Sequence, residues 1–312
     1  MRALSYVIFC CLFAVAHAEA LDAQAEIRAI AKTIEERFYD PNRGRAIAAK
    51  LVGEAEQGAY DDIDDPRELA TKLTSRLRAI DGHFRVVWGN ASPAPRRASS
   101  GGAARGRSGQ AQHGFGRVEV LPGNVGYIEL LEAAHFDFAD SDSPVRAKAD
   151  EVLARVRDSD ALILDLRENG GGSPAMVGYL VSAFVSPRED VYNRFYTREA
   201  VFNERPDVFY PDPLLKTPLF VLVGPGTASA AESIAYTLQA CGRATVVGER
   251  SAGAANPGTL FDTGRGYAVF VPTGSPRNPL TKRNWEGEGV QPDVSVAAAD
   301  ALPRALELAT RR

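Results

Sequence analysis

The sequence predicts an α/β protein in which a small helical domain precedes a core of alternating strands and helices. Over residues 21–85 the apolar positions recur at the spacing of one helix face. Further along, residues 161–166 and 219–223 are short apolar runs, and each is followed by a glycine-rich turn and a helix-favouring segment. Strands that alternate with helices in this way argue for parallel pairing, so we expect a parallel sheet in the core.

Composition limits the class of protein. The chain has 312 residues, of which 45% are hydrophobic, and this is ample for one large domain or two smaller ones. Its formal charge of -4 gives no basic field for nucleic acid, and no helix rich in lysine and arginine indicates binding to a membrane surface. We therefore expect neither nucleic acid nor a membrane as a partner.

Residues 1–18 have the pattern of a signal peptide. Arg2 precedes an apolar stretch over residues 4–15, and Ala16-His17-Ala18 forms an A-x-A cleavage site. This pattern predicts export, to the periplasm or the exterior, and a mature chain that begins at Glu19. An uncleaved anchor is the alternative, but the stretch is shorter than the roughly 20 residues of a membrane-spanning helix, and no later segment reaches that length.

Cleavage of the signal would also remove two of the three cysteines. Cys10 and Cys11 lie in the signal, so the mature chain keeps only Cys241. A single cysteine excludes an internal disulfide and a cysteine-ligated zinc site.

Residues 19–88 are predicted to form the helical N-terminal domain. Breaks at Asp40-Pro41 and Asp65-Pro66 separate its helices, and the helical spacing gives way to a short β-like run that ends at Trp88. Residues 89–112 are mostly alanine, serine, glycine, proline and arginine, so we interpret them as a flexible linker or surface loop. Residues 113–312 form the second domain.

The second domain begins with a predicted β-hairpin. Residues 115–121 and 125–131 flank a Pro-Gly-Asn turn, which is typical of such a pair of strands. The remaining expected elements are a helix at 144–158, a strand at 161–166, a helix with Ser173 as N-cap and Pro174 at its first position, a strand at 219–223, a helix that ends near Ala240 and a strand at 244–248.

Ser229 is the candidate nucleophile. It lies between the predicted strand 219–223 and the helix that follows, where free N–H groups and the helix dipole favour developing negative charge. The other interpretation is structural, because Ser229 and Glu232 have the spacing of a capping box. Local sequence leaves both open.

A second glycine-rich turn, Gly170-Gly171-Gly172, follows the strand at 161–166. It lacks the lysine of a phosphate-binding loop and the spaced glycines of a dinucleotide fingerprint, so nucleotide binding is not expected. Glycines without side chains instead allow backbone N–H groups to approach a reacting carbonyl.

Six segments that occur in order along the chain have a further significance: residues 81–84, 115–127, 164–172, 227–232, 242–249 and 285–293. Together they resemble the tail-specific, or C-terminal processing, serine peptidase superfamily. The resemblance covers most of the mature chain and is closest to the branch of the tricorn core domain and the repeats of interphotoreceptor retinoid-binding protein. It implies a crotonase-like (ClpP/crotonase) β/α core behind the helical domain, with Ser229 as nucleophile.

The general base has to be found separately, because a serine hydroxyl is a weak nucleophile until a neighbour takes its proton. In the processing-peptidase branch this neighbour is a lysine, and Ala254 stands at that position here. His83 matches the histidine of the tricorn-like branch, and an imidazole suits proton transfer near pH 7. His135, His113 and the lysine Lys282, in a polar loop, are weaker candidates.

Glu286 matches the acidic residue that organises this histidine in the family. A serine links the two in tricorn-like members, whereas this chain has Gly82, so Glu286 reaches His83 directly, through water, or not at all. Glu288 is a rival close in sequence. The resemblance assigns the oxyanion hole to the backbone N–H of Ala230 and to one from the glycine loop, either Gly171 or Gly172.

These observations predict an exported serine peptidase that forms an acyl-enzyme on Ser229 with His83 as base. Neither a metal nor an organic cofactor is needed, and the partner is a peptide or protein substrate. The polar linker leaves no room for a separate peptide-binding PDZ module, and the sequence indicates neither the cleavage preference nor the oligomeric state. The alternative is a non-catalytic carrier of apolar ligands on the same scaffold.

Overall fold

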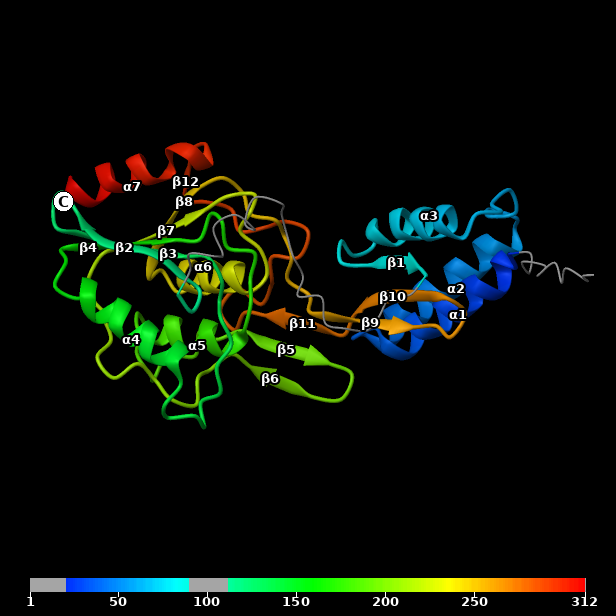
Figure 1. The fold of residues 1–312 in the computed structure, drawn as a ribbon, viewed down its shortest axis with the longest axis horizontal. Helices are drawn as coiled ribbons and strands as arrows, with labels where there is room; N and C mark the ends of the chain where they lie inside the picture. The colour runs from blue at the N-terminus through cyan, green and yellow to red at the C-terminus, as the bar shows by residue number, and fades with distance from the viewer. Residues whose placement is uncertain (1–20, 90–111, 312) are drawn as a thin grey trace, which may run out of the picture.

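The computed structural model describes residues 21–89 and 112–311, which form two lobes joined by extended strands (Figure 1). A helical lobe lies at one end of the long axis, and an α/β core lies at the other. The predicted signal peptide, residues 1–18, lies outside the described residues, as does most of the predicted linker. Within the described ranges, no helix combines the length and apolar character needed to cross a membrane.

The core is built on a six-stranded sheet with the order β12-β8-β7-β4-β3-β2. Its strands pair in parallel except for β2, which runs antiparallel to β3 as the first arm of the predicted hairpin. The predicted α/β core is thus confirmed. The strands are β2 (Phe115–Leu121), β3 (Val125–Leu130), β4 (Ala161–Asp165), β7 (Leu219–Val223), β8 (Ala244–Gly248) and β12 (Val294–Ser295).

Helices cover both faces of this sheet (Figure 1). Alternate strand residues point to opposite faces, so Leu162 and Val221 pack with α4, α5 and α6, whereas Ile163 and Phe220 pack with α7. Both faces are therefore apolar, which explains the continuous apolar runs in the sequence. The helices are α4 (Pro144–Val156), α5 (Pro174–Ser182), α6 (Ala230–Ala240) and α7 (Ala301–Thr310), the last preceded by a 3-10 turn, η3 (Ala298–Asp300).

The helical lobe contains α1 (Ala23–Arg37), α2 (Pro41–Glu56) and α3 (Pro66–Arg78). The two predicted breaks are helix starts, because Asp40 caps α2 and Asp65 caps α3, each with a proline at the first helical position. The carboxylate of Asp40 accepts the N–H groups of Asn42 and Arg43, which have no partner within the helix.

The helical lobe also takes in residues 258–272, which the sequence analysis assigned with the rest of 113–312 to the second domain. Strands β9 (Gly258–Asp262) and β10 (Tyr267–Pro272) form a three-stranded sheet with β1 (Arg85–Trp88), in the order β1-β10-β9. The reason is packing, since Tyr267, Val269 and Val271 are buried among the apolar residues of the helices.

A third sheet, β11-β5-β6, lies between the lobes in Figure 1. Strand β11 (Gly274–Arg277) almost continues β10, and it pairs with β5 (Arg194–Thr197), which pairs with β6 (Val201–Asn203). The sequence analysis predicted none of the three strands.

A fully buried carboxyl group anchors this sheet to the core. Oε2 of Glu204 accepts hydrogen bonds from Ser233 Oγ at 2.6 Å and from Asn193 Nδ2 at 3.0 Å. Ser233 belongs to α6, and Asn193 precedes β5. Burial raises the pKa of Glu204 to about 7, and the two hydrogen bonds oppose this rise only in part.

We predict that Glu204→Gln stabilises the protein at alkaline pH. Because burial disfavours the ionised carboxylate, the native protein loses stability as the pH rises from the group's ordinary pKa of 4.5 through about 7, and the loss is complete above that range. The amide stays neutral, so at pH 8 the variant's free energy of unfolding should be higher by roughly 2–3 kcal/mol. Denaturant unfolding at pH 5 and pH 8 measures the difference, which should shrink at pH 5.

The exposed Glu199, in the turn between β5 and β6, supplies the control. Glu199→Gln should change stability little at either pH. An equal gain in both variants, or a Glu204→Gln protein that is less stable at pH 8, would contradict the assignment.

Candidate active site

Ser229 lies at the sharp corner between β7 and α6 and has a strained backbone. Its φ and ψ are 54° and -120°, a region that residues with a side chain seldom occupy. Holding such a conformation costs on the order of 1–3 kcal/mol, and strained residues of this kind cluster at functional sites. An ordinary N-cap serine has extended dihedrals, so capping alone does not explain the geometry.

Neighbouring hydrogen bonds hold the corner in place. The hydroxyl of Thr227 donates to the carbonyl of Leu166 at 2.8 Å, and the N–H of Ala228 donates to the carbonyl of Asn169 at 3.0 Å. Both acceptors lie in the segment that follows β4. The corner between β7 and α6 is therefore held in place by the segment that follows the adjacent strand, β4.

Glu232 anchors the corner from inside the protein. Its buried carboxylate accepts the N–H of Ser229 at 2.9 Å, the hydroxyl of Ser251 at 2.5 Å and the N–H groups of Gly253 and Ala254 at 2.7 and 2.8 Å. Burial raises the pKa of Glu232, and these four donors oppose the rise. The predicted capping contact is present, but Glu232 also connects α6 to the segment that carries Ala254.

The glycine loop lies against Ser229. A Cβ atom on Gly171 would lie 2.8 Å from the Cβ of Ser229, and Gly171 has a φ of 116°, so a larger residue does not fit. Its N–H donates to Asn169 Oδ1 at 2.8 Å. No hydrogen bond from the N–H of Gly172 or Ala230 is found in residues 21–89 and 112–311, so these two donors are better placed for an oxyanion than Gly171.

His83 lies in the loop between α3 and β1, on the helical lobe, and two carboxylates share its Nδ1 atom. Asp81 Oδ1 and Glu286 Oε1 are each 3.2 Å from it. Burial lowers the pKa of His83, but the two adjacent carboxylates outweigh burial and raise it to about 9. The two acids therefore favour the protonated imidazole.

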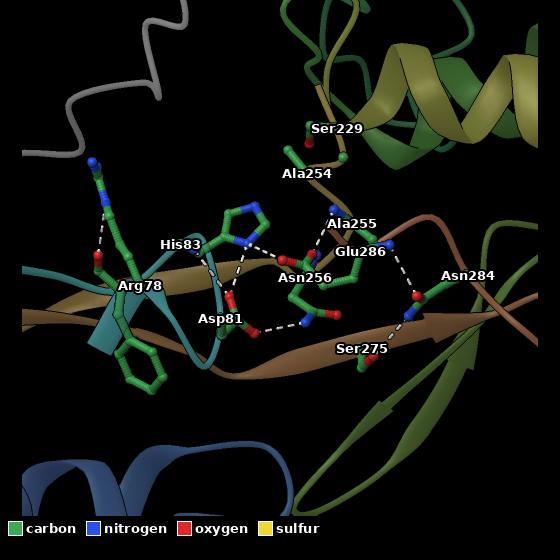
Figure 2. Close-up of polar contacts among 12 residues, drawn as sticks. Arg78, Asp81, His83, Ser229, Ala254, Ala255, Asn256, Ser275, Asn284 and Glu286 are labelled. Atoms are coloured by element: carbon green, nitrogen blue, oxygen red, sulfur yellow. Dashed lines mark hydrogen bonds and ion pairs between the residues drawn. The ribbon is translucent and has the colours of Figure 1, made fainter. Parts of the chain in front are cut away.

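Three contacts fix the two carboxylates. Asn256 Nδ2 donates to Asp81 Oδ2 at 2.8 Å, and the N–H groups of Ala255 and Asn256 donate to Glu286 Oε2 at 2.9 and 3.0 Å (Figure 2). Burial raises the pKa of Asp81, but its hydrogen bonds with His83 and Asn256 outweigh burial and hold the pKa below its ordinary value.

Glu286 is thus in direct reach of His83, although Gly82 stands where tricorn-like members have a serine. Glu288 is exposed, and no contact between it and His83 is present in the described part of the chain. Asp81 is not among the site residues predicted from the sequence. The feature of the sequence that indicates its contact with His83 is the Asp-x-His spacing. At this spacing Asp81 Oδ1 also accepts the N–H of His83, at 3.0 Å, in a local turn.

The structure does not join Ser229 to His83. No hydrogen bond between the two is found in the described residues; in Figure 2 Ser229 lies beside Ala254, whereas His83 lies nearer to Asp81 and Asn256. Ala254 lies near Ser229, since the N–H groups of both donate to the same Glu232 oxygen.

The other base candidates lie elsewhere. Lys282 is exposed on the wall of a cavity between the lobes. His135 is exposed and contacts Ser173 Oγ through Nδ1 at 2.9 Å, and His113 is exposed in the turn before β2. Of the three histidines that the structure describes, His83 is half-buried and the other two are exposed.

A polar cavity of about 430 Å³ opens between the lobes beside these carboxylates. Asp81, Asn256 and Glu286 lie in its wall together with residues of α2 and β11. Charged and polar side chains dominate the wall, which suits a polar ligand such as a peptide backbone better than an apolar one.

Comparison with known protein families identifies the family to which the chain belongs. The sequence pattern of Peptidase family S41 matches residues 124–296, more than half of the chain. The chain belongs to Peptidase family S41. This confirms the resemblance to the tail-specific serine peptidases.

Curated relatives of this S41 chain are longer proteins. It is 30% identical over 183 residues to a carboxy-terminal-processing protease of Bartonella bacilliformis, an alignment covering 58% of this chain and 40% of that protein. It is also 30% identical over 172 residues to a carboxyl-terminal-processing protease of Picosynechococcus, covering 55% of this chain and 39% of the relative. The chain thus matches about two fifths of the length of each.

Solved structures share the fold over nearly the whole chain. The photosystem II D1 C-terminal processing protease superimposes with a TM-score of 0.59 at 18% identity, covering 93% of this chain and 97% of that one. A lipoprotein from Streptococcus agalactiae gives a TM-score of 0.56 at 14% identity, covering 96% and 99%. Such low identities show a common fold and nothing more about activity.

We predict that Ser229→Gly is more stable than Ser229→Ala. Alanine keeps the Cβ atom that makes the positive φ unfavourable, whereas glycine adopts it freely, so the free energy of unfolding should differ by about 1 kcal/mol in favour of glycine. Chemical denaturation of the two variants measures this difference.

The exposed helical residue Ala147 in α4 provides a control of opposite sign. There glycine should lower stability by about 0.5–1 kcal/mol relative to alanine. A glycine that destabilises position 229 as it does position 147 would show that the backbone is not strained in solution.

Proposed function

We propose that this chain is a serine peptidase that hydrolyses peptide bonds through an acyl-enzyme on Ser229. The strained corner supports the proposal most directly, because it exposes the hydroxyl at a helix start and keeps the glycine loop against it. Attack of Ser229 Oγ on a peptide carbonyl would place the resulting oxyanion near the N–H groups of Ala230 and Gly172.

His83 is the proposed base, with Glu286 and Asp81 as its positioning residues. It takes the Ser229 proton during attack and returns a proton to the leaving amine. The imidazole has to be neutral before it acts, so the proton that the two carboxylates stabilise must leave first. Catalytic hydrogen bonds often tighten only when substrate is bound, and the proposal requires such a step to bring His83 to Ser229.

The substrate we propose is a peptide or protein chain. The relatives matched by sequence are named as carboxyl-terminal-processing proteases, which favours the same class of substrate here. A carrier of apolar ligands is less well supported, since the cavity beside His83 is lined mainly by polar and charged groups and a carrier needs no strained serine.

Labelling with a fluorophosphonate probe tests the nucleophile. The probe should modify Ser229, as located by peptide mapping, and Ser229→Ala should lose both labelling and peptide cleavage. If Ser229 stays unlabelled while the folded protein cleaves peptides, another nucleophile acts. A protein that cleaves no peptide in a broad library yet binds an apolar fluorophore with or without Ser229 would be a carrier.

Single-turnover acylation tests the base. His83→Ala should slow acylation by about 10²–10⁴-fold, the usual contribution of a positioned base, whereas Lys282→Ala should leave it near the native rate. Lys282 is a suitable control because it lines the same cavity but is exposed. Loss of acylation in Lys282→Ala alone would reverse the assignment.

We also propose export, on the basis of the A-x-A pattern at residues 16–18. Protein recovered from the exported fraction should have an intact mass that corresponds to a chain starting at Glu19. A mass that retains residues 1–18 would show that the signal is not cleaved there.

A further inference from the structure

Three potential metal ligands converge between the two lobes. Nδ1 of His83 lies 3.2 Å from Asp81 Oδ1 and 3.2 Å from Glu286 Oε1, and the three ligand atoms all lie within 4.8 Å of one another. Asp81 and His83 come from the helical lobe, whereas Glu286 comes from the loop after β11. One imidazole nitrogen and two carboxylate oxygens are a common donor set for a divalent transition metal.

Hydrogen bonding within the protein accounts for only one of the two contacts at Nδ1. An imidazole Nδ1 carries one hydrogen in the ring plane, so it cannot make a well-aligned hydrogen bond to two oxygens at once. The contact with Asp81 satisfies hydrogen-bond geometry. Glu286 Oε1 is buried and has no hydrogen-bond partner in the described residues, although it is as close to Nδ1. A buried carboxylate oxygen without a donor is costly.

The outer oxygen of each carboxylate is already held by the protein. Asn256 binds Asp81 Oδ2, and the N–H groups of Ala255 and Asn256 bind Glu286 Oε2 (Figure 2). These contacts turn Oδ1 of Asp81 and Oε1 of Glu286 toward the imidazole. Outer hydrogen bonds that orient the ligating atoms in this way are typical of metal sites.

We infer that Asp81, His83 and Glu286 bind a divalent transition cation of the Zn²⁺ class, which joins the two lobes. Tetrahedral zinc with bonds near 2.0–2.1 Å keeps its ligand atoms about 3.3 Å apart, close to the 3.2 Å that separates Nδ1 from each carboxylate oxygen. Mg²⁺ and Ca²⁺ fit less well, because they prefer six or more oxygen ligands. The polar cavity, whose wall includes Asp81 and Glu286, provides access and space for a water in the fourth position.

The bound cation would hold His83 in an inactive form. Binding at Nδ1 displaces the proton there to solvent, and the hydrogen that remains on the ring is at Nε2. His83 then has no lone pair with which to accept the Ser229 proton. The inhibition rests on the proposed function, whereas cation binding does not, so the two are tested separately.

Calorimetric titration of the EDTA-treated mature protein with Zn²⁺, together with absorption spectra after addition of Co²⁺, tests the site without measuring activity. The native protein should bind one Zn²⁺, give a tetrahedral Co²⁺ spectrum and unfold at a higher temperature with the metal. Glu286→Gln removes a charged ligand and should weaken Zn²⁺ binding at least about 100-fold. This exceeds the loss of affinity that follows mutation of residues that only hydrogen-bond to a ligand. The matched control is Glu288→Gln, which lines the same cavity outside the ligand set and should bind as the native protein does.

Asp81→Asn provides a second ligand variant, and circular dichroism in EDTA verifies that each variant is folded. Absence of stoichiometric Zn²⁺ binding to the native protein would overturn the inference. Equal affinity in Glu286→Gln and Asp81→Asn, or an equal loss in Glu288→Gln, would overturn it as well. If Zn²⁺ binds as expected but a fluorophosphonate never labels Ser229 in the EDTA-treated, metal-free protein, the metal site stands and the peptidase proposal fails.

Discussion

Four successive backbone N–H groups, those of residues 253–256, connect the two halves of the candidate site. Gly253 and Ala254 donate to Glu232, on the helix that follows Ser229, and Ala255 and Asn256 donate to Glu286, beside His83. Each carboxylate is buried or half-buried, so breaking either pair would remove two of its hydrogen-bond donors in a place that water reaches poorly. The separation between Ser229 and His83 is therefore set by one short segment and two glutamates.

Elements governed by local sequence were predictable. The runs at 161–165 and 219–223 form buried strands, Asp40 and Asp65 cap helices, and Ser173 caps α5 as expected. In each case the signal and the structure lie within a few residues of each other. The positions of Ser229 and the glycine loop were predictable for the same reason, because both come directly after strands of a parallel sheet.

Contacts between distant segments were not predictable from local patterns. Strand β10 pairs with β1 although almost the whole core separates them along the chain, and Asn256 binds Asp81 across 175 residues. Neither residue has a neighbour in sequence that indicates its partner. The same applies to Glu232, whose capping spacing was visible but whose bonds to Ser251 and Gly253 were not.

Because position 254 is an alanine, its side chain cannot take the proton of Ser229, and His83 is left as the candidate base. The N–H of Ala254 and that of Ser229 bind the same Glu232 oxygen, but an alanine side chain has no group that accepts a proton. If Ser229 is the nucleophile, its base has to come from the other lobe, and its approach depends on how the lobes are held. The two carboxylates that fix His83 attract any cation at Nδ1, whether a proton or a metal ion. Because His83 is a base only when Nδ1 or Nε2 has a free lone pair, the acids that position it also oppose its use until the cation leaves.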